Sequence, residues 1–409
     1  MALKPDRSRF LGNVAAYAAS EAAGKASRLL VVLAVSRFLE PAEIGLAAAA
    51  LAAAEILKSL TENGVVQRIV AAPDGDLDAA CRAAHRLFWM WCGGLFALQA
   101  LGALAFYILG GAPLIAAMAA ILAVEYLFMP GGLVQCALAM RAGRLKETAF
   151  VSGAQIVGAN LLTAALACAW PSAWALVLPK IISAPVWLIG MRRLSAWRPN
   201  RGERLPARRF VRFGASVLGV EALKALRLQA DKLIIGGLLG AEALGAWFFA
   251  VNAGLGLATS FATAFSTVLF PHLCAAENRE RTFGVSLGLG LAVLAPIVLL
   301  QATLAPVYVP ILFGERWSEL ASLVSILCLA AIPALIWAAA GQWLRAHDQA
   351  GLEFRLSVLL AALTVAAVAG LAPIGLEAVA WGVLVVSSAF LLGFCIFFLQ
   401  TRNRALKEV

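Results

Sequence analysis

The sequence predicts an all-α integral membrane protein with about 12 transmembrane helices in two six-helix lobes. The first observation is composition: 62% of the 409 residues are hydrophobic and 14% are charged, against roughly 45 to 50% and 25% in soluble proteins. The second is a series of apolar runs separated by connections whose positive charge alternates. The third is a repeat that relates the two halves of the chain.

Apolar runs bounded by turn residues and charges predict the helices in order. Each run is long enough to cross a bilayer with some tilt. About 120 residues then remain for the termini and connections, so no connection can hold a folded soluble domain. The predicted helices are 12–38, 42–66, 87–109, 113–139, 148–170, 173–191, 211–238, 243–270, 284–311, 318–344, 354–372 and 376–399.

The basic residues predict the orientation of these helices. The chain has 33 Lys and Arg against 23 Asp and Glu, a net charge of +10. Of these 33, 24 lie at the two termini or in even-numbered connections, whereas Arg316 is the one clear case in an odd-numbered connection. Cytoplasmic loops carry the excess of Lys and Arg. We therefore expect a multi-pass membrane protein with both termini cytoplasmic, and no nucleic-acid partner.

An ungapped shift of 200 residues superposes parts of the chain on each other. Arg9-Phe10 falls on Arg209-Phe210, Glu21 on Glu221, and Gly45 on Gly245. An even number of spans in each half gives parallel repeats, with a binding site expected between them. We expect a first lobe at 1–195, a basic cytoplasmic linker at 196–209 and a second lobe at 210–409.

Ionisable residues also occur inside the predicted spans, where each costs about 2.5 to 3.5 kcal/mol on insertion scales. The groups lie at helical spacing along one face of a span. They are Glu21, Lys25 and Arg28 in the first span, Glu55, Lys58 and Glu62 in the second, and Glu221, Lys224, Arg227, Asp231 and Lys232 in the seventh. Glu125 and Lys180 are more isolated.

Two interpretations fit these groups. Pairs such as Glu21 with Lys25 or Glu55 with Lys58 have the spacing of ion pairs within one helix. Pairing alone does not remove the desolvation cost, however, so the charged faces are expected to line a polar cavity between spans 1, 2 and 7.

Sequence motifs for other chemistry are missing. No GxxxxGK[ST] or HExxH string occurs, and the seven Cys form no CxxC pair, so nucleotide hydrolysis and a metal site are not expected. Asp74, Asp76 and Asp78 resemble a calcium loop, but Ala79 and His85 replace its Gly and closing Glu. We expect no catalytic residues, no metal and no cofactor.

Several segments resemble a known family in family order. The segment ADKLIIGGLLGAEALGAWFFA is typical of the seventh and eighth helices, ILFGERW of the end of the ninth, and FLEPAEIG of the first loop. Leu133 to Lys146 and WPSAWALVLPKIIS resemble further family segments. One departure is Trp247, where family members usually carry Tyr. The chain thus resembles the bacterial polysaccharide transporters of the multidrug/oligosaccharidyl-lipid/polysaccharide exporter superfamily.

The resemblance implies a flippase of the bacterial inner membrane that carries an undecaprenyl-pyrophosphate-linked oligosaccharide from the cytoplasmic to the periplasmic leaflet by alternating access. Its partners would be this lipid, membrane lipids and other polysaccharide assembly proteins. A cationic cavity would then bind the pyrophosphate through Lys25, Arg28, Lys58, Lys224 and Arg227. The acids Glu21, Glu55, Glu221 and Asp231 would line the cavity or couple transport to protons or sodium, unless the membrane potential acting on the lipid's charge provides the drive.

Three other functions stay open from the sequence. A multidrug cation antiporter of the same superfamily would prefer an acidic cavity, whereas the charged residues expected at membrane depth are seven basic and six acidic. A peptidoglycan-precursor flippase would have the same general build. A membrane glycan polymerase or ligase would need a sizeable outer loop with catalytic side chains, and the predicted outer connections are short.

Overall fold

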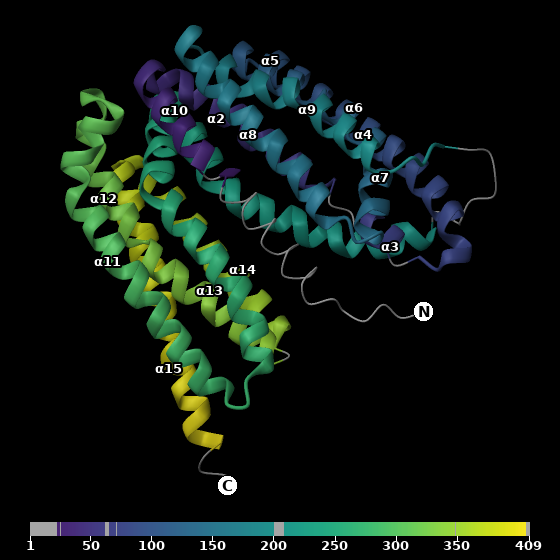
Figure 1. Ribbon diagram of the computed structural model, residues 1–409. Helices are drawn as coiled ribbons and strands as arrows, with labels where there is room; N and C mark the ends of the chain where they lie inside the picture. The colour runs from purple at the N-terminus through teal and green to yellow at the C-terminus, as the bar shows by residue number, and fades with distance from the viewer. Residues whose placement is uncertain are drawn as a thin grey trace. The chain divides into compact units, whose positions relative to one another are not determined.

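The computed structural model describes residues 23–405 except residues 25, 62–64, 71, 200–207 and 348 (Figure 1). Within these residues the chain forms α-helices and short 3₁₀-helices, and no β-strand. The chain divides into two compact units, Met1–Gln229 and Ala230–Val409. The division falls inside one long helical segment, α10 (Arg208–Ala275).

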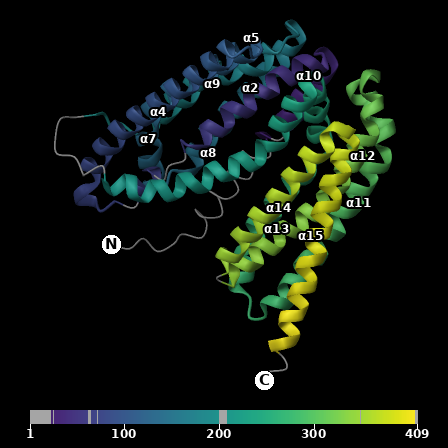
Figure 2. The same cartoon turned by 180° about the vertical axis from the view of Figure 1, so that it is seen from behind.

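The N-terminal unit begins with a helix at residues 26–38. Its further elements are α2 (Pro41–Ser59), α3 (Val65–Val70), η1 (Asp74–Asp76), α4 (Leu77–Ile108), α5 (Pro113–Leu122), α6 (Glu125–Phe128), α7 (Pro130–Arg141), α8 (Leu145–Ala169) and α9 (Trp174–Leu194). Pro41, Pro113 and Pro130 each open a helix, where the missing N–H group is of no consequence. Helix α9 packs against α2, α5, α7 and α8, so it lies in the middle of this unit (Figure 2).

The C-terminal unit contains residues 230–275 of α10 and five further α-helices. They are α11 (Arg279–Phe313), α12 (Ala321–Leu329), α13 (Ala331–Ala346), α14 (Ala350–Leu371) and α15 (Leu376–Ala405), with η2 (Glu315–Leu320) and η3 (Ala372–Ile374) between them. Helix α12 packs against α11, α13 and α15, and α14 packs against α13 and α15.

Eight helical segments of the described chain are long and apolar enough to cross a membrane, or nine if the bent pair α5–α6 and α7 counts as one span. Large apolar side chains on these segments face outward: Phe150 is 74% exposed and Ile108 is 72% exposed. Only a lipid environment makes such a surface favourable on spanning helices. The predicted all-α membrane fold is confirmed, while the count of twelve spans stays a prediction.

The described parts of the twelve predicted ranges are mostly helical, with two informative differences. The range 113–139 is broken at Met129 and bends by 48°, because Pro130 has no N–H group and its ring clashes with the preceding turn. Helix α4 begins at Leu77, ten residues before the apolar run that predicted it. Its first turns are amphipathic, so hydropathy alone did not include them.

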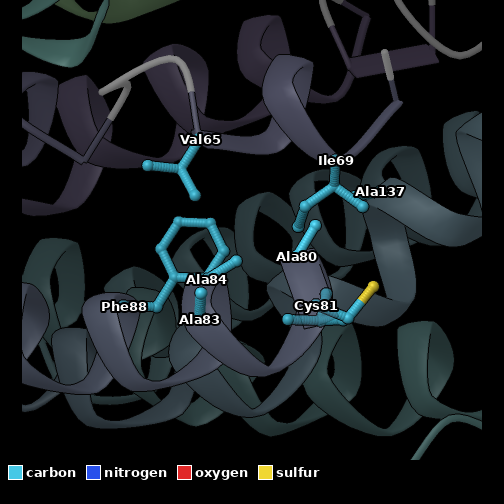
Figure 3. Close-up of a cluster of buried hydrophobic side chains, with 9 residues drawn as sticks. Val65, Ile69, Ala80, Cys81, Ala83, Ala84, Phe88 and Ala137 are labelled. Atoms are coloured by element: carbon cyan, nitrogen blue, oxygen red, sulfur yellow. The ribbon is translucent and has the colours of Figure 1, made fainter. Parts of the chain in front are cut away.

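The first turns of α4 form an apolar core with α3 and α7 (Figure 3). The Phe88 ring and Ile69 are almost fully buried there, next to Ala80, Ala84 and Ala137. Alanine side chains allow helix backbones to approach closely, which is the usual packing mode inside a bilayer. In the C-terminal unit Gly254 has the same role, because a Cβ atom there would lie 3.1 Å from the Val324 carbonyl oxygen.

The segment α10 is two helices that fold back on each other. Gly240 has φ 85° and ψ −177°, a backbone conformation that glycine adopts readily because it has no Cβ atom. Asp231 and Trp247 would lie about 24 Å apart along a straight helix at 1.5 Å per residue, yet their side chains are 2.8 Å apart. The chain therefore turns sharply at Gly240, which agrees with the separate helices predicted at 211–238 and 243–270.

Candidate functional site

Two ion pairs join different helices of the N-terminal unit. Lys58 Nζ of α2 lies 2.7 Å from Glu125 Oε1 of α6. Lys180 Nζ of α9 lies 2.5 Å from Glu55 Oε1 of α2. The four side chains are between 13% and 37% exposed, so they lie neither in the apolar core nor fully at the surface.

Helix α2 positions both pairs. Glu55 and Lys58 are three residues apart and share one helical face, and α2 packs against α5 and α9. The partners come from segments that are 67 and 125 residues away in the chain. Glu125 and Lys180 are more isolated in the sequence, and the structure gives both a defined place beside α2.

Hydrogen bonds beside Glu125 hold the short helix α6 in position. The Tyr126 hydroxyl donates to Gln99 Oε1 at 3.0 Å, and Gln99 Nε2 donates to the Ala119 carbonyl oxygen at 2.7 Å. Both side chains are buried. Trp91 Nε1 also donates to the Leu60 carbonyl oxygen at the end of α2. These contacts were not predicted, although a glutamine inside the apolar run of α4 was a visible signal.

Arg28 adds a third cation near these pairs. Its side chain is exposed on the helix at 26–38, and it interacts electrostatically with Glu55. The helix is fixed against α8, because Asn160 Nδ2 donates to Ser27 Oγ at 2.9 Å. We name Arg28, Glu55, Lys58, Glu125 and Lys180 the N-unit charge cluster. With three cations and two anions it carries a net charge of +1.

Six further charged residues of the predicted spans divide into two groups. Glu21, Lys25 and Glu62 lie outside the described residues. Glu221, Lys224 and Arg227 lie on α10, but their side chains are not among those described. Their part in a common cavity therefore stays a prediction.

Asp231 belongs to the C-terminal unit. Its Oδ2 accepts a hydrogen bond of 2.8 Å from Trp247 Nε1, and its Oδ1 lies 3.6 Å from Lys232 Nζ. Trp247 is 2% exposed. The indole N–H at this position thus supplies a donor, as the hydroxyl of the usual family Tyr would.

Two of the three aspartates around the start of α4 take part in structural contacts. Asp74 Oδ1 accepts from Arg141 Nη2 at 2.5 Å. Asp78 pairs with Arg82, and Trp197 Nε1 donates to its Oδ1 at 2.9 Å. Among the residues that the structure describes, no group of three or more His, Cys, Asp or Glu side chains is placed to hold a metal ion.

Comparisons with known proteins identify relatives of this chain. The model of a family described as polysaccharide biosynthesis protein matches residues 33–322. The lipopolysaccharide biosynthesis protein WzxC of Escherichia coli (strain K12) is 21% identical over 254 residues, covering 60% of this chain and 52% of WzxC. The succinoglycan biosynthesis transport protein ExoT of Rhizobium meliloti (strain 1021) is 24% identical over 314 residues, covering 74% of this chain and 62% of ExoT. The chain thus matches about half to three fifths of the length of these relatives.

Two solved structures share the fold. The lipid II flippase MurJ in an inward closed conformation superposes with a TM-score of 0.77 at 11% identity, covering 95% of this chain and 87% of MurJ. An inward-facing multidrug resistance MATE family transporter of the MOP superfamily gives 0.70 at 15% identity, covering 94% and 96%. At such identities the likeness concerns the fold alone. The family model covers most of the chain, confirms the family that the sequence motifs indicated, and shows that the chain belongs to the polysaccharide biosynthesis protein family.

Proposed function

We propose that this protein translocates an undecaprenyl-pyrophosphate-linked oligosaccharide from the cytoplasmic to the periplasmic leaflet by alternating access, during the synthesis of a surface polysaccharide. The N-unit charge cluster is the observation that carries the proposal. Its three cations lie on helices of a membrane protein, where an excess of positive charge needs an anionic partner. Family membership and the biosynthetic roles named for the two curated relatives support the same function.

The substrate explains why a protein is needed. Each sugar hydroxyl costs about 4 to 8 kcal/mol when it enters a medium without hydrogen-bond partners, and the pyrophosphate adds charge. A polar route through the protein removes most of this barrier. The prenyl tail is apolar and can stay in lipid during the movement.

The pairing of the two acids argues against a site for cationic drugs. Glu55 and Glu125 are each bound to a lysine, so the two acids and the two lysines balance each other and Arg28 supplies the excess positive charge of the cluster. Arg28 is exposed beside them, which favours an anionic headgroup. The experiment below distinguishes a flippase from a cation antiporter, because loss of an antiporter would alter drug tolerance and leave the lipids normal.

The experiment is lipid analysis of a deletion strain, with mass spectrometry and leaflet-selective labelling. We expect the sugar-loaded lipid to accumulate in the cytoplasmic leaflet and the surface polysaccharide to be lost. The intact gene should reverse both effects, Arg28→Ala should reverse them poorly, and Arg37→Ala on the same helix should act as the intact gene does. Normal lipids together with altered drug tolerance would refute the proposal.

For the energy source we propose coupling through Glu21 and Glu221, which the sequence repeat relates, to protons or sodium. The membrane potential is the alternative, because it favours outward movement of negative charge by about 2.3 kcal/mol per charge per 100 mV. Transport in vesicles should depend on pH or sodium in the wild type and lose this dependence in a Glu21→Gln, Glu221→Gln double variant. If transport by the wild type depended on neither pH nor sodium, coupling to these ions would be wrong and the membrane potential would be the energy source.

A further inference from the structure

A hollow with a volume of about 600 Å³ opens between α10 and α13 in the C-terminal unit. Its polar lining comes from Thr259, Thr263 and Ser266 of α10 and from Gln342 and Arg345 of α13. The ring of Phe270, which is 38% exposed, lies at the same hollow. We name it the α10–α13 groove.

Helical spacing explains why these side chains gather. Thr259, Thr263, Ser266 and Phe270 follow one another at intervals of four, three and four residues, which places them on one face of α10. The adjoining faces of the two helices are apolar and closed, with Leu269 and Leu273 of α10 packed with Ala339 and Ala346 of α13. The groove is thus a polar strip along a fixed helix contact.

The groove has little net charge although it contains an arginine. Arg345 Nε donates to Glu353 Oε2 at 2.6 Å, and Arg345 Nη2 donates to Glu353 Oε1 at 2.7 Å. Gly341 leaves room for this pair, because a Cβ atom there would lie 3.2 Å from Glu353 Oε1. The two-point contact neutralises the guanidinium and fixes its plane. The N-unit charge cluster, by contrast, carries a net positive charge.

This lining suits a neutral molecule with many hydroxyl groups. Threonine and serine hydroxyls and the glutamine amide both donate and accept hydrogen bonds, as sugar hydroxyls do. The Thr263 hydroxyl donates to the Thr259 carbonyl oxygen at 2.8 Å, and this bond fixes the orientation of the side chain at the groove. An exposed aromatic ring offers an apolar surface for the C–H face of a sugar ring. The volume lies in the usual range for small-molecule sites.

We propose that the α10–α13 groove binds a sugar unit of the lipid-linked oligosaccharide. The inference rests on the proposed function and adds to it the part of the substrate that this groove recognises. That part is the glycan, which differs between such lipids, and not the pyrophosphate, which they share.

The test compares two lipids on the purified full-length chain in detergent, with binding measured by native mass spectrometry. One probe is the lipid-linked oligosaccharide extracted from the deletion strain, and the other is undecaprenyl pyrophosphate without sugar. The variant Thr263→Val, Gln342→Leu removes a hydroxyl and an amide from the groove. We expect it to bind the glycan-bearing lipid about tenfold more weakly, the effect of one or two lost hydrogen bonds, and to bind the sugar-free lipid as the wild type does.

The matched control is Thr303→Val, Gln349→Leu. Thr303 is exposed on α11 and its hydroxyl also donates to the carbonyl oxygen four residues earlier, and Gln349 is exposed before α14. This control should bind both lipids as the wild type does. Unchanged binding of the glycan-bearing lipid by the groove variant, or an equal loss for both lipids, would overturn the inference. A wild type that binds neither lipid would instead refute the proposed function, and the inference with it.

Discussion

At the scale of single residues, the charged side chains of the N-terminal unit find their partners across helices. The sequence placed Glu55 and Lys58 on one helical face, but their partners Lys180 and Glu125 lie far away in the chain. Spacing within a helix cannot predict such contacts, because they depend on which helices become neighbours. The sequence therefore predicted which residues are charged at membrane depth, and the fold decided how they pair.

The pair between Lys58 and Glu125 should contribute to stability. Glu125→Gln keeps the size of the side chain and removes its charge, leaving a partly buried ammonium group with a weaker partner. We expect a loss of about 1 to 3 kcal/mol in the free energy of unfolding, between the values for exposed and buried pairs. Unfolding in detergent measures it. The control Glu147→Gln breaks the exposed pair with Arg144 and should cost less than about 1 kcal/mol; equal losses would contradict this account.

The hydrogen bond from Trp247 to Asp231 is a second residue-scale feature. Asp231 Oδ1 is buried and has no hydrogen-bond partner within the described residues, although Lys232 Nζ lies 3.6 Å away, so the hydrogen bond from Trp247 to Oδ2 is the closest contact of the carboxylate. Trp247→Phe removes that donor and should destabilise the fold by about 1 to 3 kcal/mol. Trp247→Tyr should lose less, since a hydroxyl restores a donor.

Thermal unfolding of both variants tests this expectation. Trp381→Phe is the control, because Trp381 is 51% exposed and the change should stay within about 0.5 kcal/mol. If the Trp247→Phe variant unfolds at the same temperature as the wild type, the hydrogen bond does not contribute to stability and the prediction is wrong.

At the scale of elements, proline and glycine explain where helices bend or turn. Hydropathy predicted the apolar ranges well, because membrane-spanning segments must be apolar over their whole length. It did not place the break at Pro130 or the early start of α4 at Leu77. The first depends on backbone sterics within an apolar run, and the second depends on amphipathic packing that an average over a window hides.

Gly240 should be the residue that tolerates substitution least at the turn inside α10. Its φ of 85° and ψ of −177° belong to a region that is essentially restricted to glycine, so Gly240→Ala should cost about 1 to 3 kcal/mol. Gly237→Ala is the control. Gly237 is helical and exposed with open space for a Cβ atom, so alanine there should stabilise by roughly 0.5 to 1 kcal/mol. Chemical unfolding measures both free energies. If both substitutions stabilised the protein, or both destabilised it, the result would contradict this account of the turn at Gly240.

At the scale of the whole molecule, the predicted topology rests on the distribution of basic residues. We expect the termini and the 196–209 segment to face the cytoplasm and the Gly110–Gly111 connection to face the periplasm. In a cysteine-free variant, single cysteines at these places should react with a membrane-impermeant maleimide from opposite sides. Labelling of the 196–209 segment in intact cells would show the opposite orientation and would contradict the prediction.

The family and the all-α fold could be predicted from the sequence because their signals are local. Apolar length, basic connections and short motifs such as ILFGERW need no three-dimensional information. The α10–α13 groove could not be predicted, since Thr263 and Gln342 become neighbours only when α10 and α13 pack through Leu269 and Ala339. The places of Glu21 and Lys25 on the first span, and of the charged side chains on the first part of α10, stay predictions.

The most direct test of the proposed function is lipid movement in vesicles reconstituted with the purified chain. A membrane-impermeant oxidant of sugars reports how fast the glycan of the lipid-linked oligosaccharide moves between leaflets. We predict movement at least about tenfold faster than in protein-free vesicles, a barrier decrease of about 1.4 kcal/mol or more, with Arg28→Ala slower than Arg37→Ala. A rate equal to that of protein-free vesicles, with the chain folded and inserted, would contradict the central claim.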